Sequence, residues 1–528
     1  MKLGTQNPQL ILVLFWLVVT AFNLTKAIHI DDTAHLHIAR AIREHPLHPM
    51  SGEFNWRDTS EPIHTMNQPH LFFTLLALTI TVVGESTLAL HLLVSLFSLA
   101  AIWLFHAIAN QISESGALLF TALFCLSPAF MPSQNVMVDV PLVVCWLAFF
   151  RALLFPALTH ECRSYLLAAA MASAALLIKY TSLVLLPLLA LALGSRKRWR
   201  LLWVVAIPVA TLIAWSLFNI FDYGGVHIFE REPASYTLGR LAIRSGAWLI
   251  CLGAVSPFML VFAARGVRQK RARLLVGTAV LLAVLVSGVS LFVADERMST
   301  SLLRGIFFGC GLLLFGRVLA ASVPSPAAPE ERIRTLLIAG WFVGTTIFVI
   351  AFAPAVAVRH VLLVSPAALL ALLHLSSRAS RKLLVTAVAL NLAIGVVLAI
   401  SDYEYADVYR EYAPRIQAKY GDNGRLWFVG HWGWKWYAEQ TGMKEYDYQL
   451  SQPETGDLLV APEFVDKQRI SREHWRRLHK IDEIVVNATP TTFFRVGPMA
   501  GYYASSVRRL PWIFSTDVVE KFLIYRFE

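Results

Sequence analysis

The chain has 528 residues, of which 56% are hydrophobic and only 15% are charged, and its formal charge is +11 at pH 7. Because soluble proteins carry about 25% charged residues, this composition excludes a water-soluble enzyme and a disordered chain. Up to Ser401 there are 29 basic and 17 acidic residues, whereas the last 127 residues contain 17 and 18. We therefore expect a membrane protein with a soluble tail, and no nucleic-acid site, since the positive charge suits cytoplasmic loops.

The apolar part predicts an all-α polytopic membrane protein with about 12–14 transmembrane helices, each needing about 20 apolar residues. The apolar runs lie near 8–28, 69–84, 86–109, 115–131, 137–158, 164–179, 181–194, 200–221, 241–264, 273–293, 301–320, 335–353, 360–376 and 382–401. Basic clusters at Arg196–Arg200, Arg265–Arg273 and Arg378–Lys382 are expected in the cytoplasm by the positive-inside rule. This part, residues 1–401, is the expected transmembrane domain.

The segment between the first two runs, residues 29–68, differs from every other loop and is the expected catalytic outer loop. Seven of the sixteen histidines fall between His29 and His70. Asp31 and Asp32 stand at the outer end of the first run, where a helical apolar pattern continues behind them. The acidic pair either caps the start of that helix, because carboxylates accept bonds from free amides, or takes part in chemistry.

Two isolated charges follow in apolar surroundings, Asp139 and Lys179. A carboxylate inside a membrane costs about 2.5–3.5 kcal/mol, so Asp139 is a functional candidate unless it reaches interfacial water. Lys179 lies at a predicted helix break, where it can meet a lipid phosphate or extend to the interface. If Asp31 and Asp139 share a site, one of the three intervening runs cannot cross. The short runs 69–84 and 115–131 are the candidates.

The tail, residues 402–528, follows a span that starts at a basic cytoplasmic cluster, so we expect it on the periplasmic, non-cytoplasmic side. Its β-like runs Leu426–Val429, Leu458–Val460, Ile484–Val486 and Phe522–Phe527 alternate with helical or polar stretches and predict a small α/β domain. The aromatic segment Gly430–Met443 is interpreted as a helix packed on this sheet, with carbohydrate stacking as the alternative.

The order of these features resembles the GT-C superfamily of polyprenyl-phosphate-dependent membrane glycosyltransferases. The features are the acidic pair, the NQPH segment that opens a helix, the SPAF segment followed by Asp139, the lysine at a helix break, and RHVLLVSPAALLAL at Arg359–Leu372. The similarity is to family 39 and RgtA/B/C/D-like sugar transferases, relatives of protein O-mannosyltransferases and the lipid A aminoarabinose transferase. It covers residues 10–195 well and the later spans loosely.

The resemblance implies inverting transfer of one sugar from an undecaprenyl- or dolichyl-phosphate donor to an envelope acceptor (lipid, glycan or protein) at the outer membrane face, in bacteria that of the inner membrane. It implies that Asp31 is the catalytic base and that Asp32 positions Asp31, a metal or the acceptor. Asp139 matches the acid after the family's SP motif, and Lys179 and Arg359 would neutralise the donor phosphate. Acceptor or sugar contacts are expected from four residues, His35, Asn67, Gln68 and His70.

Two departures from the family pattern matter. The aminoarabinose transferase has an acid–lysine–proline step where this chain reads Asn67-Gln68-Pro69, which argues against that activity. The arginine and tyrosine that follow its acidic pair are here Ala34 and His35. The spacing of Asp31, Asp32 and His35 permits a divalent metal (Mn, Mg or Zn), or the histidine bonds sugar hydroxyls instead.

Two other classes of function remain alternatives. In a transporter or flippase of lipid-linked saccharides, Asp139 and Lys179 would line a translocation path through the membrane. In a non-catalytic envelope scaffold, the pair Asp31 and Asp32 would only cap a helix. The surface-fixed acidic pair and the outer tail favour the enzyme.

Overall fold

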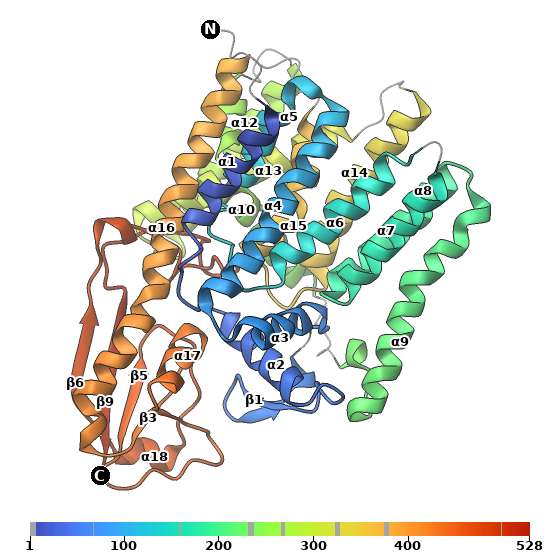
Figure 1. The fold of residues 1–528 in the computed structure, drawn as a ribbon. Helices are drawn as coiled ribbons and strands as arrows, with labels where there is room; N and C mark the ends of the chain where they lie inside the picture. Colours follow the sequence, from blue (N-terminus) through green and yellow to red (C-terminus); the bar gives the residue numbers. More distant parts are fainter. Residues whose placement is uncertain are drawn as a thin grey trace.

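The computed structural model describes the chain except for residues 1–6, 67, 158–159, 231–236, 266–269, 323–327, 374–379 and 498. A bundle of helices forms the apolar part, and a small β-sheet region projects from one end of it (Figure 1). The bundle contains α1 (Pro8–Ala21), α3 (Leu71–Val83), α4 (Thr87–Ile112), α5 (Glu114–Cys125), α6 (Asp139–Leu154), α7 (Glu161–Leu176), α8 (Leu185–Ser195), α9 (Ala206–Tyr223), α10 (Leu238–Ala254), α11 (Phe258–Arg265), α12 (Lys270–Phe292), α13 (Met298–Ala321), α14 (Pro329–Ala351), α15 (Val358–Leu372) and α16 (Arg381–Tyr420). These helices follow the predicted apolar runs, and the expected fold class is confirmed.

Six helical segments of the described chain are long and apolar enough to cross a membrane, and shorter apolar helices pack among them. The segments are Thr87–Ile112, Trp199–Tyr223, Arg273–Phe292, Met298–Ala321, Pro329–Ala351 and Arg381–Asn423. In two of them, at α9 and α12, only 11% of the apolar stretch is buried inside the protein. Such surfaces need a hydrocarbon solvent, so the chain is an integral membrane protein.

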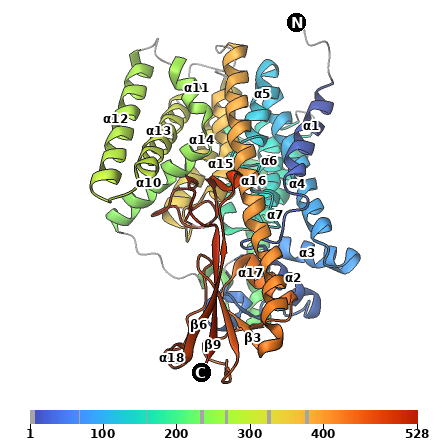
Figure 2. The same cartoon turned by 90° about the vertical axis from the view of Figure 1, so that its left-hand side faces the viewer.

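The second apolar run forms α3, which lies across the end of the bundle in both views (Figures 1 and 2). Its 13 residues span about 20 Å, which is short of the roughly 30 Å hydrocarbon core. Leu78 and Val82 on its outer side are 59% and 82% exposed. The orientation of α3 favours the run at 69–84 as the one that does not cross, because α5, with 12 residues, runs along the bundle and continues into the buried segment 126–138.

At the same end of the bundle lie α2 (Asp32–Glu44) and the hairpin of β1 (Glu53–Asn55) and β2 (Ser60–Pro62). The turn that contains Arg196–Arg200 lies at the other end, between α8 and α9. This separation agrees with a cytoplasmic position for that basic cluster and an outer position for the acidic loop. The other two basic clusters fall partly outside the described residues.

The tail has a five-stranded sheet in the order β4-β3-β5-β9-β6. Its strands are β3 (Leu426–Phe428), β4 (Lys444–Glu445), β5 (Leu458–Pro462), β6 (Leu478–Val486) and β9 (Glu520–Phe527), with a separate pair β7 (Phe494–Arg495) and β8 (Ile513–Phe514) and a short helix α18 (Arg472–Arg477). Helix α17 (Trp432–Gln440) occupies the aromatic segment. Its Trp434 ring lies 5.0 Å from the Phe522 ring, so the segment packs on its own sheet as interpreted.

Helix α16 continues without a break from the bundle to Tyr420, through the expected boundary between residues 401 and 402. Buried apolar side chains of the bundle and of the tail belong to one continuous core, which includes Tyr405, Trp434 and Phe522. The tail also holds the outer loop. Lys435 Nζ donates to Asn55 O at 3.0 Å, and Asp447 accepts from Ser60 N at 2.8 Å. The tail therefore fixes the hairpin in place.

Helices α10 and α13 cross closely at Gly253. We therefore expect substitutions at two glycines of α10 to differ in their effect on the stability of the protein. A Cβ at Gly253 would lie 1.7 Å from Phe307 O of α13, whereas a Cβ at Gly246 meets no atom within 4 Å. We expect Gly253→Ala to destabilise the protein by about 1–3 kcal/mol, because helices have to move apart. Thermal unfolding in detergent measures this, with Gly246→Ala as the matched control. Equal unfolding midpoints for both variants would contradict the tight crossing.

Candidate functional site

The chain enters α2 through a sharp turn at Ile30, whose φ is +49°. This left-handed conformation is disfavoured for a β-branched residue and costs about 1–3 kcal/mol, so the surrounding contacts must hold it. After the turn, the Asp31 side chain remains 24% exposed while Asp32 is fully buried. The Asp31 side chain makes no capping bond to α2. Helix capping therefore does not explain this carboxylate.

Asp31 forms an ion pair with Arg359, the second residue of α15, which is 328 positions away in the sequence. Burial alone would raise the pKa of Asp31. The positive charge of Arg359 and its hydrogen bond to Asp31 oppose burial, so the pKa of Asp31 lies below its usual value. Asp31 is thus an ionised carboxylate at neutral pH, held at the end of the bundle that carries α2 and the tail.

A second ion pair lies beside the first. Lys179 Nζ is 3.0 Å from Asp139 Oδ1, and the two side chains are only 13% and 8% exposed. Lys179 follows the end of α7, and Asp139 begins α6. A cavity of about 10 Å³, lined by Asp139, Lys179, Arg359 and His360, joins the two pairs. The sequence-predicted charges Asp31, Arg359, Asp139 and Lys179 therefore come together at one place.

Asp32, expected to position Asp31, a metal or the acceptor, makes different contacts from Asp31. Its side chain is fully buried, and its Oδ2 accepts a hydrogen bond from His29 N at 3.1 Å. Burial raises the pKa of Asp32 well above its usual value. Successive helical residues point about 100° apart, and here the two adjacent acids make different contacts. Asp32 supports the turn at the start of α2.

Sequence reasoning missed a buried polar network under this turn. Asp402 of α16 accepts from Lys26 Nζ at 2.9 Å and from Tyr503 OH at 2.7 Å, and His29 Nε2 lies 3.2 Å from it. Lys26, His29 and Asp402 are all fully buried. The available signal was an isolated lysine at the end of the first apolar run and an acid directly after the last. The network ties the end of α1, α16 and the tail together.

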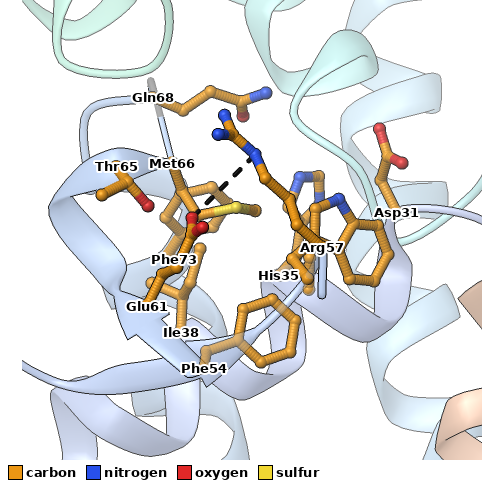
Figure 3. Close-up of a pocket in the computed structure, with 12 residues that line it drawn as sticks. Asp31, His35, Ile38, Phe54, Arg57, Glu61, Thr65, Met66, Gln68 and Phe73 are labelled. Carbon is orange, nitrogen blue, oxygen red and sulfur yellow. Dashed lines mark ion pairs between the residues drawn. The ribbon is translucent and has the colours of Figure 1, made fainter. Parts of the chain in front are cut away.

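A cavity of about 230 Å³, here called the loop cavity, opens on one side of Asp31 (Figure 3). Asp31 lies at one side of it and Glu61 and Thr65 at the other, with Arg57 reaching between them. Arg57 Nε is 3.9 Å from Glu61 Oε2. Further lining residues are Ala34, His35, Ile38, Phe54, Trp56, Met66, Gln68 and Phe73. Aromatic rings beside polar groups suit the apolar faces and hydroxyls of a sugar.

A cavity of about 130 Å³, here called the tail cavity, lies on the other side of Asp31. It is lined by Ile30, Asp31, Arg359, Tyr405, Trp432, Phe464, Val496, Gly497, Ala500, Tyr503, Ala504 and Arg509. Most of these residues belong to the tail or to the outer end of α16. Asp31 is thus the residue that lines both cavities, and Arg359 reaches the tail cavity and the small cavity between the two ion pairs.

The four residues expected to contact acceptor or sugar have different positions. His35 and Gln68 line the loop cavity. Burial lowers the pKa of His35, whose Nδ1 lies 3.1 Å from Val136 O, so its ring is neutral. His70 is 4% exposed, neither of its ring nitrogens has a hydrogen-bond partner among the described residues, and it lines neither cavity. Asn67 lies outside the described residues.

The residues do not fit the metal site that the spacing of Asp31, Asp32 and His35 permitted. Within the described ranges, no three side chains of His, Cys, Asp or Glu come close enough to hold a metal ion. Asp32 bonds the backbone of His29, and His35 Nδ1 faces a carbonyl. The helical spacing was compatible with a shared face, but the turn at Ile30 sends the first acid toward Arg359.

A family model described as dolichyl-phosphate-mannose-protein mannosyltransferase matches residues 67–220. The matched segment contains Asp139 and Lys179, and it confirms the resemblance to polyprenyl-phosphate-dependent membrane glycosyltransferases. No curated protein matches the chain at a significant level.

Solved structures of three membrane proteins are similar to this chain. ArnT from Cupriavidus metallidurans in the apo state is 16% identical, with 86% of this chain and 92% of that chain covered and a TM-score of 0.40. The apo oligosaccharyltransferase of Archaeoglobus fulgidus is 14% identical, with 86% and 62% covered and a TM-score of 0.46. The arabinosyltransferase EmbB from Mycobacterium smegmatis is 14% identical, with 75% and 41% covered and a TM-score of 0.30. Because these sequence identities and TM-scores are low, function has to be argued from the chain's own residues.

The pair of Asp139 and Lys179 predicts a strong energetic coupling. Removing one partner of a buried ion pair leaves an uncompensated charge and costs about 3–5 kcal/mol. We expect Lys179→Met to lower the thermal unfolding midpoint clearly and Lys179→Met combined with Asp139→Leu to recover much of the loss. Unfolding of the two single variants and the double variant in one detergent measures the coupling. Additive effects would show that the pair does not interact.

Proposed function

We propose that this chain, an integral membrane protein similar to the polyprenyl-phosphate-dependent glycosyltransferases, transfers one sugar from a polyprenyl-phosphate-linked donor to an envelope acceptor. The observation that carries the proposal is the position of Asp31, an ionised carboxylate between two cavities with two cations beside it. The reaction takes place at the outer face, where α2, the hairpin and the tail meet. In a bacterium this is the periplasmic face of the inner membrane.

Asp31 acts as the general base in this proposal. An acceptor hydroxyl gives its proton to Asp31 as its oxygen attacks the anomeric carbon of the donor sugar. The bond from that carbon to the phosphate oxygen breaks on the opposite side, and its electron pair leaves with the polyprenyl phosphate. The product therefore has inverted configuration. A base that borders two cavities suits this geometry, because donor and acceptor must approach the carbon from opposite sides.

Lys179 and Arg359 hold the donor phosphate. Each already has a carboxylate partner, Asp139 and Asp31, so the cations are oriented before the substrate arrives. Asp139 is then a positioning residue for Lys179, and Asp32 is a positioning residue for the turn that presents Asp31. The donor sugar occupies the loop cavity, where Trp56 and Phe54 offer rings and His35 and Gln68 offer polar atoms.

The transporter alternative has less support. Asp139 and Lys179 would have to line a path across the bilayer, but the cavity between them has only about 10 Å³, room for about one water. Their side chains are nearly buried and satisfy each other. The open volumes lie at the outer end, on both sides of Asp31.

Asp31→Asn is expected to lower the release of polyprenyl phosphate by about 10²–10⁴-fold, because the amide cannot accept the acceptor's proton. The assay uses purified protein, a polyprenyl-phosphate-linked sugar and envelope extract as acceptor. Asp422→Asn, an exposed acid of the tail, is the matched control and should keep full turnover. Unfolding midpoints show that both variants are folded. Full turnover in Asp31→Asn would remove the base assignment.

The pH dependence of turnover should report on Asp31 and Arg359 together. Because the folded pKa of Asp31 is lowered, the base stays ionised as the pH falls from 7 to its usual range and is lost only below it. In Arg359→Gln, the charge of Arg359 no longer offsets the effect of burial on the pKa of Asp31, so this pKa rises. The acid limb of kcat/KM should therefore move to higher pH. Profiles of both proteins, measured between pH 4 and 8, test this. An unmoved limb would contradict the electrostatic role of Arg359.

A further inference from the structure

The tail cavity contains an arginine that the proposed function leaves without a role. Arg509 lines this cavity from the tail and is exposed. Within the described part of the chain its side chain has no hydrogen bond or ion pair, unlike Arg359 and Arg57, the other arginines that line the two cavities. An unpaired guanidinium at a cavity wall offers up to five donors in a planar fork to an anion.

The charged side chains that line the two cavities beside Asp31 differ. The loop cavity is lined by two acids, Asp31 and Glu61, and one arginine, Arg57. The tail cavity is lined by one acid, Asp31, and two arginines, Arg359 and Arg509. Because Arg359 is paired with Asp31, Arg509 is the cation of the tail cavity that is left to attract an anion, and walls of low dielectric strengthen this attraction.

We propose that the tail cavity is an anion-binding subsite in which Arg509 binds a phosphate or carboxylate group carried by the acceptor. The assignment of the anion to the acceptor rests on the proposed function, whereas the anion site itself does not. The donor phosphate is the other source of such an anion. The acceptor is favoured because the proposed function places the donor sugar in the loop cavity, on the other side of Asp31.

The tail cavity has room for a small anionic group. Its 130 Å³ correspond to about four water molecules at about 30 Å³ each. The rings of Trp432, Tyr405 and Phe464 provide apolar walls. A group bound here has Asp31 within the same cavity, so a hydroxyl next to the anionic substituent would reach the base.

The test is direct binding to the full-length protein, without turnover. The probes are glucose 1-phosphate, with glucose as the neutral comparison, and undecaprenyl phosphate for the donor. Arg509→Gln should weaken binding of glucose 1-phosphate roughly tenfold, the effect of losing one charge-assisted bond, and leave undecaprenyl phosphate binding unchanged. Arg508→Gln is the matched control, because this neighbouring exposed arginine does not line the cavity. It should bind both probes like the unmodified protein.

Each other outcome overturns part of the proposal. Weaker binding of undecaprenyl phosphate in Arg509→Gln would assign the anion to the donor and overturn the acceptor source. Equal binding of glucose 1-phosphate and glucose, or equal losses in Arg508→Gln and Arg509→Gln, would overturn the anion site. The proposed function fails by a different result, full turnover in Asp31→Asn. A failure of one is therefore distinguishable from a failure of the other.

Discussion

The ion pair of Asp31 with Arg359 is the contact on which the site depends. It joins the start of α2 to the start of α15, and both cavities meet at its carboxylate. Buried charges are stable only when they are paired, so the helices that carry them must be held at a fixed distance. A second, nearly buried ion pair, Lys179 with Asp139, lies next to Arg359. Alternating charges thus keep two cations and two carboxylates together at the end of the bundle that carries α2 and the tail.

The tail is part of the site and not an appended module. Helix α16 enters it without a break, and Asp402 at the level of the outer loop binds Lys26 and Tyr503 from two different parts of the chain. The tail also forms hydrogen bonds with the β1–β2 hairpin, which lines the loop cavity. Both cavities therefore need the tail for their shape. The charge difference between them likewise depends on it, because Arg509 comes from the tail.

The sequence located the main charges for a physical reason. In an apolar run a lone Asp or Lys is costly, so Asp139 and Lys179 stand out without any structure. The same reasoning could not find Arg509, since the tail is rich in charges and nothing in its sequence separates one arginine from the next. It also could not foresee how the two adjacent acids separate. The left-handed turn at Ile30 leaves Asp31 at the cavities and buries Asp32.

The sequence by itself determined that this is a helical membrane protein, where its apolar segments lie and which isolated charges stand out within them. Hydropathy and charge bias are local properties, and they can be read along the chain. Only the tertiary structure decided that α3 lies across the bundle, that Asp31 pairs with a residue 328 positions away, and that two cavities with different charged residues border it. These features arise from contacts between distant segments, and no local pattern of residues encodes which segments will meet.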